Sequence, residues 1–391
     1  MKITNEINDL HADMTTWRRH LHAWPELGYQ EHRTADFVAE RLASFGLEVH
    51  RGLGGTGVVG VLKVGDGPGT IGLRADMDAL PMPEAGAHAH CSKNPGVFHA
   101  CGHDGHMAML LGAAQHLART RRFNGTVHCI FQPAEEGLAG ARAMIQDGLF
   151  ERFPCDEVYA MHNWPGLPPG QLAVHTGPVM ASADLFEIEV HGKGGHAAMP
   201  HLCLDPVVVA AHLITALQTI VSRGNPTEAA VVSVSQLNAG TAHNVLPDTA
   251  VLRGTARALS PATRARVEAE IRRISAGMAA AFGARIEVHW HPTYPPTVNH
   301  AGPAKRAARV AGPLFEAVHT DLPPTMGAED FAFMLEARPG AYLWLGGGGV
   351  GLHGSRYDFN DAVLPLGAAL FCALVEDFLP GQGLARSEIS Q

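Results

Sequence analysis

The strongest constraint on the fold is an alternation of short β-rich runs with helical stretches near both ends of the chain. Residues 5–43 have the apolar spacing of two helices, interrupted at Pro25–Gly28. Val58–Val64 and Thr70–Arg74 have the composition of strands, and a turn-forming segment separates them. The alternation resumes over residues 303–379. This pattern predicts an α/β domain with a mixed, largely parallel sheet flanked by helices.

A second, self-contained pattern interrupts the first one between Asp184 and about Trp290. Its six predicted elements follow the order strand, helix, strand, strand, helix, strand, which is the unit of a ferredoxin-like sandwich. At 391 residues, the chain is also long for a single compact core. We therefore expect a discontinuous α/β domain of residues 1–183 and 297–391 and an inserted α+β ferredoxin-like domain of residues 184–296.

Composition and charge exclude several classes of partner. A net charge of −9, with no window rich in Lys and Arg, argues against binding to nucleic acid. The most apolar window, Val207–Val221, is short and contains polar residues, so we expect no membrane span. The first twenty residues have no secretory signal pattern, which predicts a cytoplasmic protein. In that compartment, the six cysteines are expected to be reduced thiols.

Glycine motifs give no sign of a nucleotide site or of an activated serine. Gly52, Gly54 and Gly57 have the spacing of a dinucleotide-binding fingerprint, but a predicted strand follows them instead of a helix. These glycines are better explained as a hairpin turn. The chain has no Gly-Lys-Ser/Thr phosphate loop and no Gly-x-Ser-x-Gly elbow.

The segment His-Ala-Cys-Gly-His-Asp-Gly-His, residues 99–106, is a dense group of metal donors before a predicted helix. Cys101 and His103 lie two positions apart, so an extended loop would turn both side chains to one side. An isolated histidine is usually an ordinary surface or core residue, but four donors in eight residues favour a metal site. Asp104 and His106 are candidates for orienting the ligand imidazoles.

A pair of glutamates follows the apolar strand that ends at Gln132. In open α/β sheets, ligands gather at this end of the strands. Consecutive side chains point in different directions, so Glu136 could bind metal while Glu135 acts as the base for the attacking water. A solvated pair at a helix start is the competing interpretation. Pro133 and Gly137 weaken it because they bracket the pair between strand and helix.

Further donors stand at the ends of other predicted strands. His162 follows one strand directly, and His353 follows a glycine-rich loop. Donors from several separate strand ends are much harder to obtain by chance than any one of them. Asp76 and Asp78 end another strand, where they could orient the ligands or cap a turn, and the sequence favours neither role.

These motifs, in their order along nearly the whole chain, resemble the M20 metallopeptidase family. The similarity is greatest to its amidohydrolase branch, which includes hippurate hydrolases and indole-acetyl-amino-acid hydrolases. The resemblance is carried by RRHLHAWPELGYQEHRTA, RADMDALPM, KNPGVFHACGHDGHMAMLLGAA, FQPAEEGLAGA, MHNWPGLPPG, GKGGHAAMPH, HNVLPD, PTMGAEDFAFML and YDFNDAVLPLG.

The resemblance implies a two-metal catalytic domain with an inserted lid domain through which subunits form a homodimer or a higher homo-oligomer. It implies two divalent ions per subunit, Zn, Mn, Ni or Co, with Glu135 as the general base. The implied ligands are Cys101, His103, Glu136, His162 and His353.

In the lid, the resemblance assigns polarisation of the scissile carbonyl to His196 and substrate binding to Asn244 and Arg257. A guanidinium matches a carboxylate in geometry, although a solvated arginine at a strand end is an equally good explanation of Arg257.

The implied function is hydrolysis of the amide bond of N-acyl amino acids, for example N-benzoyl or N-acetyl compounds. A dipeptidase and an N-acetyl-amino-acid deacetylase share the same catalytic residues and remain alternatives. A metal- or acyl-amino-acid-binding protein without turnover is a third alternative, although such a protein has no use for Glu135.

Two segments depart from the family pattern: Gly354 and Ser355 stand where Asn-Pro usually follows the last ligand, and residues 85–92 read AGAHAHCS.

Overall fold

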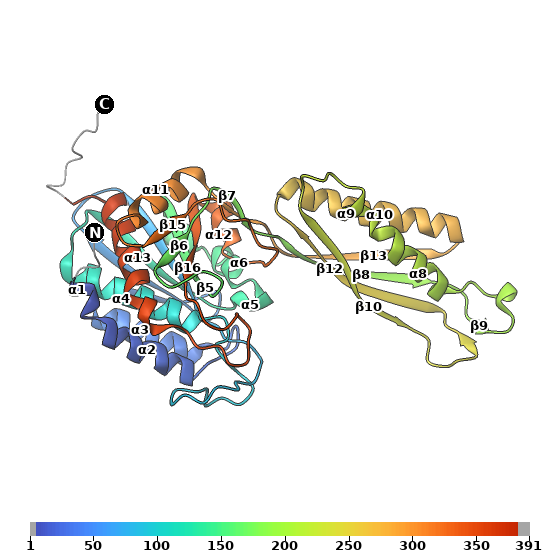
Figure 1. Ribbon diagram of the computed structural model, residues 1–391, viewed down its shortest axis with the longest axis horizontal. Helices are drawn as coiled ribbons and strands as arrows, with labels where there is room; N and C mark the ends of the chain where they lie inside the picture. The colour runs from blue at the N-terminus through green and yellow to red at the C-terminus, as the bar shows by residue number, and fades with distance from the viewer. Residues whose placement is uncertain (1–4, 382–391) are drawn as a thin grey trace, which may run out of the picture. The chain divides into compact units, whose positions relative to one another are not determined.

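The computed structural model describes residues 5–381, which form two compact units (Figure 1). The first unit runs to Gly177, includes Val298–Pro323 and continues from Asp330. The second unit consists of Pro178–Thr297 and Pro324–Glu329. Pro324–Glu329 was expected in the first unit and not in the second. It joins the second unit through backbone hydrogen bonds: the N–H of Ala181 donates to the carbonyls of Thr325 at 3.1 Å and Gly327 at 2.9 Å.

A mixed eight-stranded sheet forms the centre of the first unit, in the order β1-β2-β4-β3-β5-β16-β6-β15. The four adjacent strands β4, β3, β5 and β16 are parallel, while β1, β2 and β6 each have antiparallel partners. The predicted fold class is thus confirmed. The strands are β1 Glu48–Leu53, β2 Gly57–Val64, β3 Thr70–Asp76, β4 Gly125–Gln132, β5 Glu157–Trp164, β6 Gln171–Ala173, β15 Ala317–His319 and β16 Gly340–Gly346.

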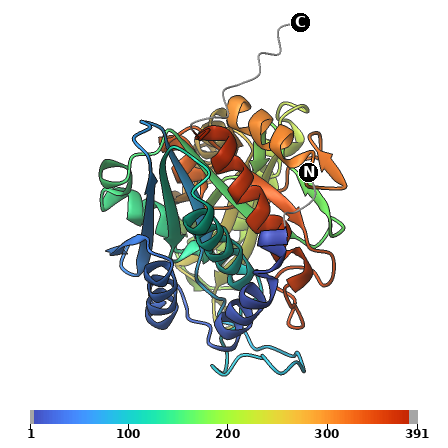
Figure 2. The ribbon, with the colours of Figure 1, turned by 90° about the vertical axis from the view of Figure 1, so that its left-hand side faces the viewer.

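Helices pack against this sheet and against one another. α3 packs on β1 and β2, α4 on β3 and α11 on β16, while α13 packs beside α4 (Figures 1 and 2). The helices of the unit are α1 Asn5–Asn8, α2 His11–Ala23, α3 His32–Ser44, α4 His103–Thr120, α5 Glu135–Leu138, α6 Gly140–Gln146, α7 Leu149–Arg152, α11 Ala301–Ala311, α12 Ala332–Ala337, α13 Leu364–Phe378 and the 3₁₀ turn η2 Asp361–Val363.

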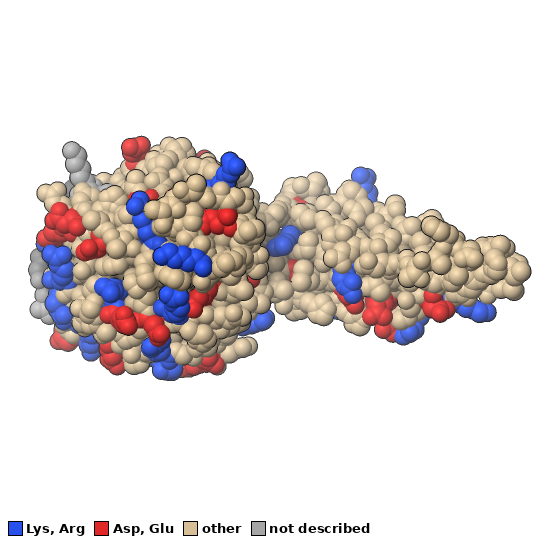
Figure 3. All heavy atoms as spheres, turned by 90° about the horizontal axis from the view of Figure 1, so that it is seen from below, with Lys and Arg blue, Asp and Glu red and all other residues tan. Residues whose placement is uncertain are grey.

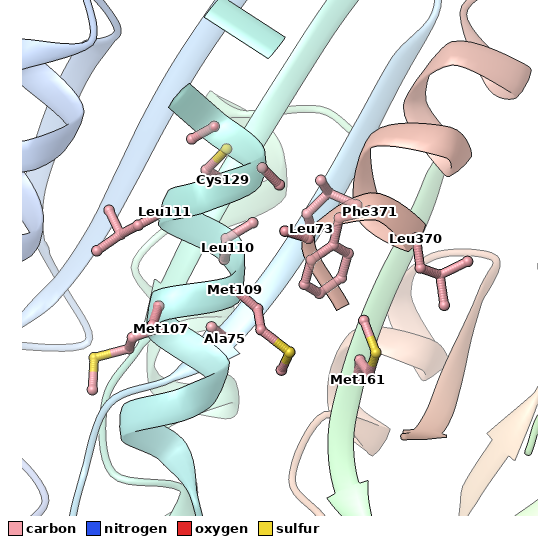
Figure 4. Packing of buried hydrophobic residues seen from close by; sticks show 14 of the residues in the cluster. Leu73, Ala75, Met107, Met109, Leu110, Leu111, Cys129, Met161, Leu370 and Phe371 are labelled. Carbon is pink, nitrogen blue, oxygen red and sulfur yellow. The ribbon is translucent and has the colours of Figure 1, made fainter. Parts of the chain in front are cut away.

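The core of the first unit is centred on α4, which is buried on almost all sides. Met107, Met109, Leu110 and Leu111 are fully buried, so this helix has no solvated face of the usual amphipathic kind. Figure 4 shows these side chains gathered with residues of β3, β5 and α13 in one apolar cluster. The first turn of α4 contains His103 and His106, so the core holds both imidazoles in place.

The hairpin between β1 and β2 explains the glycine motif Gly52, Gly54 and Gly57. β1 and β2 pair in antiparallel fashion, and Leu53 lies opposite Gly57. Gly52 and Gly54 have positive φ values of 90° and 60°, which glycine adopts without strain. The prediction of a hairpin turn is confirmed.

The second unit has a four-stranded antiparallel sheet in the order β10-β12-β8-β13, with the predicted strand and helix succession. α8 and α10 pack on it. Each begins with a capped turn, in which Asp205 or Ser260 accepts a backbone hydrogen bond and proline follows. The main elements are β8 Ala183–His191, α8 Pro206–Leu217, α9 Thr219–Ser222, β10 Ala230–Ala239, β12 Thr249–Ala258, α10 Pro261–Phe282 and β13 Arg285–Tyr294.

Short elements complete the chain. β9 Gly195–His196 pairs with β11 Val245–Leu246. β7 Gly177–Met180 pairs with β14 Thr297–Asn299, and η1 is Pro200–Leu202.

Acidic and basic side chains are interspersed on the face shown in Figure 3, where no large basic patch is visible. None of the helices within residues 5–381 combines the length and apolar character needed to cross a membrane.

Candidate metal centre

Cys101, His103 and His162 form the buried part of a donor cluster. Cys101 stands just before α4, His103 is the first residue of that helix, and His162 lies near the end of β5. The Sγ of Cys101 is 3.4 Å from the Nε2 of His162. One donor atom from each of the three residues lies within 4.8 Å of the other two. A loop, a helix start and a strand end thus bring these donors to one point.

Glu136 and His353 extend the cluster; Glu136 is partly buried and His353 is exposed. Donor atoms of Cys101, Glu136 and His353 lie within 4.8 Å of one another. The Oε1 of Glu136 is 3.5 Å from the Nε2 of His353 and 3.9 Å from the Nε2 of His103. All five predicted ligands therefore meet, in two triads that share the Cys101 thiol.

The side chains of the cluster fit divalent metal ions. In the described part of the chain, the buried Nε2 of His103 and Oε1 of Glu136 have no hydrogen-bond partner. A buried polar atom left in this state is costly unless another group satisfies it. One thiolate, several imidazoles and a carboxylate are the donors that zinc and neighbouring transition metals accept. The donor chemistry and the unpartnered atoms thus both favour a divalent metal ion at this cluster.

Glu135 lies on a tight turn whose backbone shows strain. Ala134 and Ala139 flank this turn with φ values of 55° and 59°, in the left-handed region that alanine rarely adopts. Gly140 follows the turn, and this position requires glycine because a Cβ there would come within 1.7 Å of the Pro133 carbonyl oxygen. The side chain of Glu135 is buried, with 7% of its surface exposed. Such strain persists only where surrounding contacts hold it.

Three buried carboxylates hold this turn through its backbone. Glu31 accepts from the N–H of Ala134 at 2.8 Å and from the hydroxyl of Thr56 at 2.6 Å. Asp78 accepts from the N–H of Glu136 at 2.9 Å, and Asp330 accepts from the N–H of Ala141 at 2.9 Å. The turn therefore presents Glu135 and Glu136 in fixed positions.

The residues predicted to orient the ligands make different contacts. The Nδ1 of His103 donates to the backbone carbonyl of Asp78 at 2.8 Å. His106 contacts Asp76 at 2.6 Å through one ring nitrogen and Asn163 at 2.7 Å through the other. Both nitrogens of His106 are therefore engaged, although its ring lies against His162. This arrangement supports the neighbouring ligands without adding another one.

Asp104 points away from the cluster. Its Oδ2 accepts from the Nδ1 of His22 at 2.8 Å and lies 3.7 Å from Arg18. Within the described chain, these contacts of Asp104 are with His22 and Arg18 and not with an imidazole of the cluster, so they do not support its predicted role in orienting a ligand.

Burial and neighbouring charges set the protonation of the cluster. Burial raises the pKa of the Cys101 thiol well above its usual value, and Glu136 and Glu135 raise it further. Burial lowers the pKa of His103, but Asp76 and Asp78 outweigh burial and bring it to about 10. A cation bound by these two residues would displace their protons, so its affinity would rise with pH.

Several supporting residues were missed by the sequence reasoning. Arg74 contacts Asp76 at 2.7 Å and Gln132 at 2.8 Å, and Gln132 in turn contacts Asp330. Asn163 holds His106 and donates to the hydroxyl of Tyr357 at 2.7 Å. Arg74 and Gln132 are polar residues inside apolar strands, and this placement could have indicated that they support the site. Nothing in the local pattern pointed to Glu31, which lies in the loop before α3.

The three predicted substrate residues of the second unit do not meet. His196 lies opposite Val245 in the β9–β11 pair, and the N–H of Ala197 donates to the carbonyl of Asn244 at 3.0 Å, so the first two are neighbours. Arg257 lies farther along β12. Eight residues separate it from Thr249, the residue of this strand that is nearest in sequence to Asn244, and at strand spacing they span about 26 Å. It is half-buried, and burial lowers the pKa of its guanidinium.

The fold and the donor cluster define a metal-dependent hydrolase. The model of peptidase family M20/M25/M40 matches residues 72–377, and the chain belongs to this family. It is a metal-dependent amidohydrolase that uses divalent metal ions. The sequence resemblance to the M20 family is confirmed.

Three similar proteins illustrate the relationship. A hippurate hydrolase of Campylobacter jejuni is 43% identical over 97% of this chain and 100% of its own length. An N-acyl-L-amino acid amidohydrolase of Geobacillus stearothermophilus is 43% identical over 80% of this chain and 86% of its own. A Bacillus subtilis structure, described as a dinuclear metal binding peptidase of the M20 family, is 36% identical with a TM-score of 0.85, covering 95% and 99% of the two chains.

Proposed function

We propose that the protein hydrolyses the amide bond of N-acyl amino acids, with N-benzoylglycine as a substrate, and releases a carboxylic acid and a free amino acid. The observation that carries this proposal is the buried Cys101 cluster beside the fixed turn of Glu135. The relationship over nearly the whole chain to a hippurate hydrolase supports the acyl preference. An N-acetyl-amino-acid deacetylase and a dipeptidase are the competing activities.

Two divalent ions would be held by Cys101, His103, Glu136, His162 and His353. When bound, the ions would supply Lewis-acid stabilisation of negative charge on the reacting oxygen atoms. The donor set admits zinc, manganese, nickel or cobalt.

Glu135 is the proposed base. Its carboxylate takes a proton from the attacking water as the water oxygen bonds to the acyl carbon. It then delivers this proton to the amide nitrogen as the carbon–nitrogen bond breaks, so the amino acid leaves with a neutral amine. The turn between Ala134 and Ala139 keeps the carboxylate in position for both transfers.

The second unit would supply the remaining contacts. We assign stabilisation of the developing oxyanion to His196 and substrate binding to Asn244 and Arg257. His196 is exposed, and Arg257 lies far from it along β12. This separation is consistent with the proposal that His196 acts on a second copy of the chain, within a homodimer formed through this unit.

A substrate panel tests the proposal. The metal-loaded protein is given benzoylglycine, N-acetyl amino acids and unblocked dipeptides, and amine release is measured. We expect kcat/KM for benzoylglycine to exceed that for glycylglycine at least tenfold. Faster cleavage of N-acetyl compounds than of benzoylglycine would identify the protein as a deacetylase. Faster cleavage of dipeptides would identify it as a dipeptidase. No amine release from any compound would leave only a binding protein.

A further inference from the structure

A second group of potential metal ligands surrounds Glu84, on the long loop between β3 and α4 (Figure 1, light blue). This loop includes residues 85–92, where the sequence departs from the family pattern. Donor atoms of Glu84, His88 and Cys91 lie within 4.8 Å of one another. None of these residues belongs to the Cys101 cluster.

The Oε1 of Glu84 is the meeting point of two imidazoles. It lies 2.8 Å from the Nε2 of His88 and 3.3 Å from the Nε2 of His22, which projects from α2. In a tetrahedral zinc site, donor atoms stand about 3.3 to 3.5 Å apart, given bond lengths of about 2.0 Å to nitrogen or oxygen and 2.3 Å to sulfur. The donor atoms of Glu84, His88 and Cys91 lie within 4.8 Å of one another, so they would draw together by up to about 1.5 Å to form such a site.

His22 has the arrangement typical of a metal-ligating histidine. Its Nδ1 donates to the carboxylate of Asp104 at 2.8 Å, and both side chains are completely buried. A carboxylate on one ring nitrogen fixes the ring and directs the other nitrogen, here Nε2, to the ligand side. That nitrogen faces Glu84.

A neighbouring triad of His22, His88 and Asp358 is less suitable. Asp358 is already paired with the buried guanidinium of Arg18 at 2.7 Å and with His90 at 3.1 Å. Moving it to a cation would leave the charge of Arg18 without this partner, which is costly for a buried group. Glu84 is instead paired with imidazoles, a backbone N–H and the Cys91 thiol, and moving it would not take a carboxylate from Arg18, so the Glu84 group is favoured.

A loop anchored by Glu84 alone is the simplest competing explanation. The Oε2 of Glu84 accepts from the N–H of Ser92 at 2.6 Å, which fixes the loop without an ion. This explanation accounts for Glu84, but it does not account for the two imidazoles at its other oxygen or for the thiol of Cys91 near this carboxylate. Together, the four side chains form a mixed sulfur, nitrogen and oxygen set that suits a transition metal.

We propose that Glu84, His88 and Cys91, with His22 as fourth donor, form a further binding site for a zinc-like divalent cation. This site is separate from the Cys101 cluster and does not depend on the proposed function. Thiolate and imidazole donors select zinc, cobalt or nickel over calcium and magnesium. His88 and Cys91 are partly exposed, so the ion has a path from solvent.

An ion at this site would link two segments of the first unit, and one of them contacts a third. His22 belongs to α2, and Glu84, His88 and Cys91 belong to the loop. The N–H of Ala85 donates to the carbonyl of Ser355 at 2.6 Å, two residues from His353. The site would therefore stabilise the segment that carries His353 through the loop, without contacting the Cys101 cluster.

Thiol labelling tests the site directly. Cys91 and Cys203 are the two cysteines that are not buried, and Cys203 belongs to the second unit. In metal-free protein, the variant Cys203→Ser reports on Cys91, and Cys91→Ser reports on Cys203. With an aromatic disulfide reagent, we expect added Zn²⁺ to slow labelling of Cys91 at least tenfold and to leave Cys203 unchanged. Equal labelling of Cys91 with and without zinc would overturn the proposal.

Two further variants separate direct from indirect protection. In Cys203→Ser/His88→Ala, zinc should no longer protect Cys91, because one ligand is missing. In Cys203→Ser/Cys101→Ala, the protection should persist, even though the other cluster has lost its shared thiol. The reverse pattern would mean that ions at the Cys101 cluster protect the loop from a distance, and the site would not exist.

Metal stoichiometry gives an independent measurement. After equilibration with zinc and removal of excess ion, wild-type protein should retain one ion more per chain than His88→Ala/Cys91→Ser. Circular dichroism checks that the double variant is folded, and Cys91→Ser alone provides a milder change. Equal metal content in folded wild-type and double-variant protein would refute the site.

Discussion

The two units present their candidate residues in opposite ways. In the first unit, donors from separate segments meet at the buried Cys101, although His353 itself is exposed, and carboxylates such as Glu31 and Asp78 hold the backbone around them. In the second unit, His196 is exposed on a two-residue strand, and Arg257 lies far along another strand. The first arrangement is complete within the folded unit. The second brings His196 and Arg257 to no common point, so we expect that experiments that disable one unit will not mimic the other.

The largest effect is expected from removal of the shared thiol. Cys101 belongs to both triads, so Cys101→Ala should lower the content of bound metal and reduce kcat/KM for benzoylglycine by more than about 10³-fold. Elemental analysis and amine release measure the two quantities. Cys372→Ala, which removes a buried thiol in α13, is the matched control and should keep its metal. Unchanged metal content in Cys101→Ala would remove Cys101 from the ligand set.

Replacement of the base should separate chemistry from metal binding. We expect Glu135→Gln to reduce kcat by about 10² to 10⁴-fold, because the amide cannot accept the proton of the attacking water. Metal content should stay at the wild-type value. If the variant binds metal and hydrolyses benzoylglycine at the wild-type rate, another group is the base.

The exposed imidazole of the second unit should affect turnover without affecting metal. We expect His196→Ala to reduce kcat by about 10² to 10³-fold, because the loss of one oxyanion donor costs about this much. His201→Ala removes a nearby exposed imidazole and should be close to wild type. Equal rates for the two variants would exclude His196 from catalysis.

Mixed chains sharpen this result. If His196 acts on another copy of the chain, a mixture of His196→Ala and Glu135→Gln subunits should regain part of the wild-type activity after exchange. Each mixed dimer would then hold one intact pair of Glu135 and His196. A mixture as inactive as its two components would place both residues on one chain.

The smallest effect is expected from a residue that acts through the backbone. Glu31→Gln weakens the acceptor for the N–H of Ala134 and should lower kcat about tenfold, with KM nearly unchanged, by loosening the turn of Glu135. Glu26→Gln is the control, because Glu26 accepts from Thr34 and not from this turn. A raised KM with unchanged kcat would contradict a positioning role for Glu31.

The sequence alone was sufficient for the fold class, the succession of elements in the second unit and the set of residues that meet around Cys101. Apolar periodicity reports which face of each element is buried, and donors placed directly after strands must gather at the ends of a sheet. Both signals are local, so they could be read without knowing which strands pair.

Only the tertiary structure decided how these residues are used. It showed that Cys101 is shared by two triads, that Asp104 faces His22 and that Glu31 holds the turn before Glu135. It also placed Pro324–Glu329 with the second unit and brought His22 to Glu84. Each of these facts is a contact between segments far apart in the chain. Local patterns determine which residues are buried, whereas the partner of each buried polar group depends on how distant segments pack.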